Sequence, residues 1–96
     1  MKFKAPVSID TALRIYYQYP EIGNKEIKEL LGMSSSKSLD RYKKAVRERQ
    51  FERGVLTSQA FTVNTEVAYE VWGIDVVDLE RRRDKLRALG LSAVNE

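Results

Sequence analysis

The chain has 96 residues, and its 17 lysines and arginines against 14 aspartates and glutamates give a formal net charge of +3. It contains no cysteine and no histidine, which excludes disulfides, thiolate nucleophiles and imidazole bases and leaves zinc without its preferred ligands. We therefore expect no enzymatic activity, no cofactor and no metal. No apolar run approaches the roughly 18 residues that span a bilayer, and no signal-peptide pattern follows Lys2 and Lys4. A cytoplasmic protein is expected.

Two short helices are predicted first along the chain. Apolar residues recur at helical spacing in both, at Ile9, Leu13, Tyr16 and Tyr17 in the first and at Ile27, Leu30 and Leu31 in the second. Ser8 or Asp10 can cap the first helix, which ends near Pro20. Asn24 is predicted to cap the second, and Gly32 to end it.

A third and longer helix is predicted after the serine-rich turn at 34–36. It runs from about Lys37 to about Arg53, with Gly54 as its stop. Its inward positions are Leu39, Tyr42 and Val46.

The segment 54–63 has no charged residue. We expect either a buried connector or a β-hairpin of Val55–Thr57 and Ala60–Val63, although no Asn-Gly or Asp-Gly turn is present. Two further helices follow at about 65–72 and 76–89, with Asp75 as the cap of the second.

The predicted fold class is therefore mostly α. We expect a three-helix unit at 1–53, a connector at 54–63 and a C-terminal helical unit at 64–96.

The stretch from Asn24 to Arg49 resembles the helix-turn-helix family of DNA-binding domains. Gly32 ends an apolar helix, Met33 packs into the turn, and Ser34 leads into the next helix. The stretch departs from the family pattern in one respect, because Leu39 comes about one position late after the glycine. The resemblance implies a tri-helical bundle whose longest helix enters the major groove of double-stranded DNA.

A second passage, 64–90, echoes the first. Five residues recur forty positions later, with Asn24, Glu26, Ile27, Leu39 and Arg41 matched by Asn64, Glu66, Val67, Leu79 and Arg81. The echo raises the possibility of a second helix-turn-helix unit, yet five matches in helical sequence are weak evidence of duplication. No helix is predicted directly before the second copy.

Basic residues concentrate in the third predicted helix, where seven bases face three acids and leave a net charge of +4. DNA binding draws most of its affinity from neutralised phosphates. The predicted DNA-binding residues are Ser34, Ser35, Ser36, Lys37, Asp40, Arg41, Lys43, Lys44 and Arg47. Among them Ser36, Lys37, Asp40 and Arg41 are expected at base edges, and Lys43, Lys44 and Arg47 at the phosphate backbone.

The sequence therefore predicts a sequence-specific DNA-binding protein, a transcriptional regulator or a regulator of the phage or mobile-element type, acting as a homo-oligomer. A charged helix face can also be merely solvated. The alternative is a protein interaction module or oligomeric scaffold, for example a DNA-packaging recognition subunit, with 54–63 and 76–89 as its interface.

Overall fold

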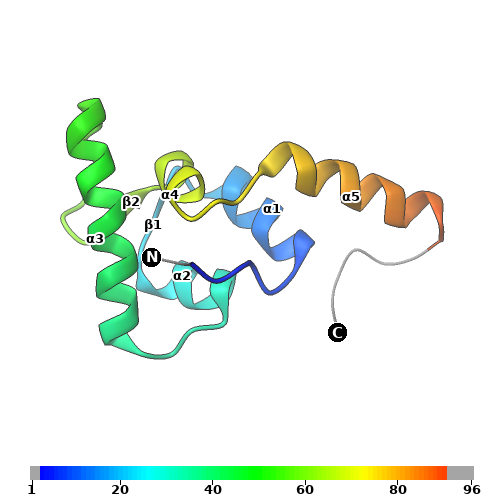
Figure 1. The fold of residues 1–96 in the computed structure, drawn as a ribbon, viewed down its shortest axis with the longest axis horizontal. Helices are drawn as coiled ribbons and strands as arrows, with labels where there is room; N and C mark the ends of the chain where they lie inside the picture. Colours follow the sequence, from blue (N-terminus) through cyan, green and yellow to red (C-terminus); the bar gives the residue numbers. More distant parts are fainter. Residues whose placement is uncertain (1–2, 91–96) are drawn as a thin grey trace.

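Helices make up most of the described chain. The computed structural model describes residues 3–90 (Figure 1). Within that range it contains five helices and two short strands, namely α1 (Ile9–Gln18), β1 (Glu21–Ile22), α2 (Asn24–Leu31), α3 (Ser36–Arg53), β2 (Val63–Asn64), α4 (Thr65–Val71) and α5 (Val76–Ala88). The predicted mostly helical fold class is confirmed.

Local capping explains where several helices begin. The Ser8 hydroxyl accepts the Thr11 amide at 3.0 Å and starts α1. Asp75 starts α5 in the same way, as predicted. The prediction that Asn24 caps α2 is wrong by one residue. Gly23 is the cap, and its amide donates to the Glu26 carboxylate at 2.8 Å, so the carboxylate of Glu26 satisfies a donor at the helix start.

Gly32 ends α2 in a left-handed conformation with φ of 64°. A Cβ atom at this position would lie 2.8 Å from the Cγ1 atom of Val7. Both the backbone angle and the close approach therefore require glycine here. The chain reverses at this residue and continues through a short turn into α3.

The two strands pair with each other across the chain. They run antiparallel, with Ile22 opposite Val63 and Glu21 opposite Asn64. The predicted hairpin within 55–63 is therefore wrong. Among the described residues, none between 55 and 62 has a positive φ, which the favoured two-residue hairpin turns require, and Val63 finds its partner in β1 instead.

The connecting loop, residues 54–62, is anchored rather than buried. The Glu21 carboxylate accepts the Ser58 amide at 2.8 Å and the Thr62 hydroxyl at 2.7 Å. These hydrogen bonds lower the pKa of Glu21. Leu56 and Phe61 are 91% and 81% exposed, so the alternative prediction of a buried connector is also wrong.

One hydrophobic core unites the elements. It takes side chains from α1, both strands, α2, α3 and α4, including Ile15, Ile22, Ile27, Leu30, Leu39, Val46, Val63 and Ala68. Burying each large aliphatic side chain contributes about 1.5–3 kcal/mol. Trp72 joins the core beside α3, where its indole N–H donates to the Tyr42 carbonyl at 3.3 Å. Tyr69 donates to the carbonyl of Ala12 at 2.6 Å.

The last helix contributes only partly buried side chains to this core, among them Val76 and Leu79. No residue of α5 is fully buried, and the helix packs beside α1 while its far end extends away from the rest of the molecule (Figure 1). The hydroxyl of Tyr17 donates to the Glu80 carboxylate between the two helices.

The order of elements recurs along the chain. Each strand leads directly into a short helix, then a glycine of positive φ, then a longer helix. Gly32 and Gly73 hold equivalent places, followed by Met33 and Ile74. The loop 54–62 separates α3 from β2, whereas only Tyr19 and Pro20 separate α1 from β1. The internal echo in sequence thus has a counterpart in local structure, while a duplication remains a prediction.

Candidate nucleic-acid interface

The helix α3 is braced from behind by α2 and α4. Its inward residues Leu39 and Val46 are fully buried, and Tyr42 is nearly so. The apolar face of α2 meets them with Ile27, Leu30 and Leu31. Leu39 enters the core despite its late position after Gly32 because α3 begins only at Ser36. The opposite face of α3 is therefore presented to solvent in a fixed orientation.

Eight of the nine predicted DNA-binding residues lie on the surface. They are Ser34, Ser35, Ser36, Lys37, Asp40, Arg41, Lys44 and Arg47, all classed as exposed. Lys37, Arg41 and Lys44 follow one another at spacings of four and three, so they form one stripe along α3. Arg47 lies further along, and its guanidinium donates to the Ala60 carbonyl of the connecting loop at 3.4 Å.

Lys43 is the exception, because it is buried. Its ammonium group donates to the Asn24 side-chain oxygen at 3.1 Å, and burial, aided by the charge of Arg47, lowers its pKa. Lys43 is one turn from both Leu39 and Val46, so helical geometry directs it inward. We therefore remove Lys43 from the candidate interface and assign it to the contact between α2 and α3.

The stripe of Lys37, Arg41 and Lys44 has no acidic partner among residues 3–90. Within the described part of the chain, none of these three cations takes part in an ion pair or a side-chain hydrogen bond. Their positive charge is thus not offset by a contacting carboxylate.

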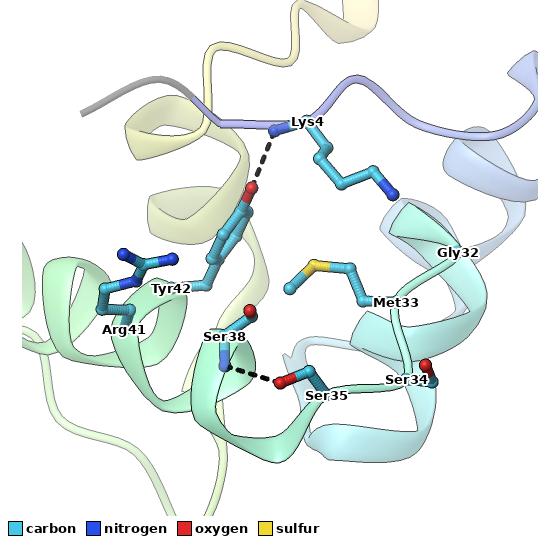
Figure 2. Close-up of a pocket in the computed structure, with 8 residues that line it drawn as sticks. All are labelled: Lys4, Gly32, Met33, Ser34, Ser35, Ser38, Arg41 and Tyr42. Carbon is cyan, nitrogen blue, oxygen red and sulfur yellow. Dashed lines mark hydrogen bonds between the residues drawn. The ribbon is translucent and has the colours of Figure 1, made fainter.

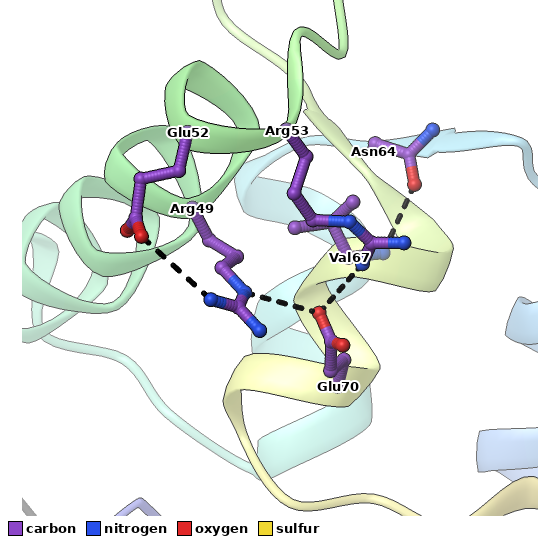
Figure 3. A network of polar contacts seen from close by, with 6 residues as sticks. All are labelled: Arg49, Glu52, Arg53, Asn64, Val67 and Glu70. Atoms are coloured by element: carbon purple, nitrogen blue, oxygen red, sulfur yellow. Dashed lines mark hydrogen bonds and ion pairs between the residues drawn. The ribbon is translucent and has the colours of Figure 1, made fainter.

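In the part of the chain that the structure describes, the arginines at the end of α3 form ion pairs, unlike the basic residues near its beginning. Arg53 and Arg49 both contact the carboxylate of Glu70 on α4, at 2.7 and 3.4 Å (Figure 3). Arg49 also lies 3.7 Å from Glu52. These bases are held by α4 and by α3 itself, so they hold the two helices together rather than adding free charge to the surface.

A hollow of about 300 Å³ opens beside the first turns of α3 (Figure 2). Its lining combines two cations with hydroxyl groups, and consists of Lys4, Gly32, Met33, Ser34, Ser35, Ser38, Arg41 and Tyr42. The first turn of α3 carries no acidic residue. Its free amides and the positive end of the helix dipole favour an anion at this place.

Lys4 was missed as a site residue by sequence reasoning. Its backbone amide donates to the Tyr42 hydroxyl at 2.9 Å, and the ring of Phe3 meets that of Tyr42 edge-on with centroids 4.9 Å apart. These contacts hold the N-terminal segment against α3. The only signal in the sequence was a basic start of the chain, which does not say where the segment lies.

Comparison of this chain with models of protein families, with curated proteins and with solved structures gives no match. None of the helices in residues 3–90 combines the length and the apolar character needed to cross a membrane.

Proposed function

We propose that the protein binds double-stranded DNA in the manner of a helix-turn-helix domain, with the first half of α3 inserted into the major groove. The single observation that carries the proposal is the stripe of Lys37, Arg41 and Lys44, which is exposed and unpaired while α3 is fixed from behind by its core contacts. Free, fixed cations are what phosphate neutralisation requires.

The proposed roles follow from position along the helix. Ser36, Lys37, Asp40 and Arg41 lie in the first two turns and would face base edges, where an arginine recognises guanine by two hydrogen bonds. Lys44 and Arg47 would contact phosphates on one side of the groove. Lys4, across the hollow from Arg41 (Figure 2), would contact a phosphate near the start of α3.

The proposal is tested by measuring the affinity for random duplex DNA against salt concentration. Each lost phosphate contact should reduce the slope of log K on log salt by about 0.9. Replacing Lys37 and Arg41 together with alanine should weaken binding and make the slope shallower. Fluorescence anisotropy with a labelled duplex gives both quantities.

Arg82→Ala with Arg83→Ala is the matched control, since it removes the same charge from α5. Arg82 and Arg83 contact the carboxylates Asp78 and Asp84, so their loss should change DNA affinity less. The opposite ranking would move DNA recognition to α5. Absence of DNA affinity at every salt concentration would favour the alternative, a protein interaction module.

A role in regulating transcription, or in a phage or mobile element, would follow from sequence-specific binding. Selection of preferred sites from a random duplex pool tests that step. Enrichment of one DNA sequence made of two half-sites supports a regulatory role. No enrichment indicates that the protein contacts only the phosphate backbone of DNA.

A further inference from the structure

The most exposed large apolar side chains of the described chain lie close together in sequence. Phe51, Leu56 and Phe61 are 89%, 91% and 81% exposed. Phe51 is on the last turns of α3, and the other two are on the connecting loop. The loop returns alongside α3 (Figure 1), where Ala60 contacts Arg47. Apolar clusters of this kind on a soluble surface mark interaction sites.

The surface around Phe51 is a shallow groove of about 490 Å³ on the outer side of α3. Five residues line it, namely Lys44, Arg47, Glu48, Phe51 and Glu52. Along the helix the two bases precede the two acids. The groove therefore has one positive and one negative end, with an aromatic ring beside the negative end.

A surface with this order of charges is complementary to itself. In a two-fold symmetric pair the same patch meets itself in the opposite direction. Two antiparallel copies of α3 with Arg47 opposite Glu52 would place Glu48 opposite Phe51, and both Phe51 rings within one turn of the symmetry axis. Each Arg47 then meets the Glu52 of the other copy, and both aromatic rings leave solvent.

From this charge order and the exposed ring of Phe51 we propose that the outer face of the second half of α3 binds a second copy of this chain. This surface, defined by Lys44, Arg47, Glu48, Phe51 and Glu52, is the dimer surface. The inference goes beyond DNA binding and does not need it.

The register has a consequence for the proposed function. Lys44 and Arg47 line this groove and are also proposed phosphate contacts, so a dimer in this register withdraws both side chains from DNA. This point alone rests on the proposed function.

The oligomeric state across a concentration series, measured without DNA by analytical ultracentrifugation, tests the inference. The wild-type chain should dimerise, and Phe51→Ser should raise the dimer dissociation constant at least about tenfold, as expected for the loss of a central aromatic side chain. Val77→Ser on α5 is the matched control, since Val77 is a 76% exposed apolar residue away from the dimer surface. It should dimerise like the wild type.

A charge exchange tests the antiparallel register. Arg47→Glu and Glu52→Arg should each weaken the dimer, because each places like charges opposite one another. The double variant should restore it. Phe51, Arg47 and Glu52 are all exposed, so circular dichroism should show an unchanged fold.

Three outcomes would overturn the inference. They are a wild-type chain that stays monomeric at every concentration, a dimer that Val77→Ser disrupts and Phe51→Ser does not, and a double charge variant no better than the single ones. Because no DNA is present, these outcomes are independent of whether the protein binds DNA.

Discussion

The helices α3 and α5 occupy equivalent places after their short partners, yet they differ in how they are held. Both are rich in arginine and lysine and both follow a glycine turn. Five residues of α3 are buried, whereas α5 has none. The first half of α3 carries unpaired cations, while the adjacent arginines 81–83 of α5 contact Asp78 and Asp84.

The number of basic residues on a helix therefore does not by itself locate a binding surface. A helix that presents cations to a rigid partner must itself be held in place, and its cations must lack intramolecular partners. The pKa of Asp78 is lowered, chiefly by its hydrogen bond from Arg81, which is the sign of charge already engaged within α5. Of these two helices, only α3 has both buried residues on its inner face and, on its outer face, exposed basic residues that form no ion pair within residues 3–90.

The first prediction is a difference between α3 and α5 in the loss of unfolding free energy when one apolar side chain is truncated. Leu39→Ala removes a fully buried side chain of α3 and should lower the free energy of unfolding by about 2–5 kcal/mol. Leu79→Ala at the equivalent place in α5, where the side chain is only partly buried, should cost clearly less. Urea denaturation followed by circular dichroism measures both. Equal losses would show that α5 belongs to the cooperative core.

Capping variants should give a smaller and qualitatively different contrast. Ser35 caps α3 through the Ser38 amide, and Asp75 caps α5 through the Asp78 amide. Ser35→Ala should lower the free energy of unfolding by about 0.5–1 kcal/mol. Asp75→Ala should instead reduce helical ellipticity at low denaturant, because α5 can fray without opening the core. A larger loss of global stability from Asp75→Ala would contradict this.

The last prediction concerns the part of the pH dependence of stability that Lys43 of α3 contributes. The pKa of Lys43 lies below its ordinary value of 10.5 because of burial. The unfolded chain therefore holds more protons just below pH 10.5, and Lys43 makes the free energy of unfolding rise with pH in that range. Lys43→Met should remove this contribution. Lys85→Met, which removes one lysine charge from the exposed surface of α5, provides the control.

Denaturation midpoints measured at several alkaline pH values, compared between each variant and the wild type, check this prediction. Identical profiles for Lys43→Met and the wild type would mean that Lys43 is protonated and solvated in the folded protein as it is in the unfolded chain.

Much of the helical layout could be predicted from local signals. The spacing of apolar residues found all five helices, and Ser8, Asp75 and Gly32 ended or began them as expected. Leu39, Tyr42 and Val46 were correctly predicted as inward residues of α3. These features depend on residues that are close together in sequence, so they could be predicted from local patterns.

The errors share a different origin. Val63 pairs with Ile22, 41 positions away along the chain, and no local pattern at 55–63 reports such a partner. Asn24 accepts a hydrogen bond from Lys43 instead of capping its own helix. The place of Lys4 on the hollow that Arg41 also lines depends on the packing of Phe3 against Tyr42. Each of these contacts joins segments that are distant in sequence.

Local sequence is enough to specify the helices, the glycines that end α2 and α3, and the concentration of positive charge in 37–53, because helix formation and capping act over one or two turns. Which cations are free of partners depends instead on how the helices pack. Lys43 is buried and donates a hydrogen bond to Asn24. Arg49 and Arg53 contact the carboxylate of Glu70. Lys37, Arg41 and Lys44 form no ion pair in the described chain. Pairing and burial depend on which distant side chains the fold brings within a few ångströms, and the free surface charge follows from that arrangement.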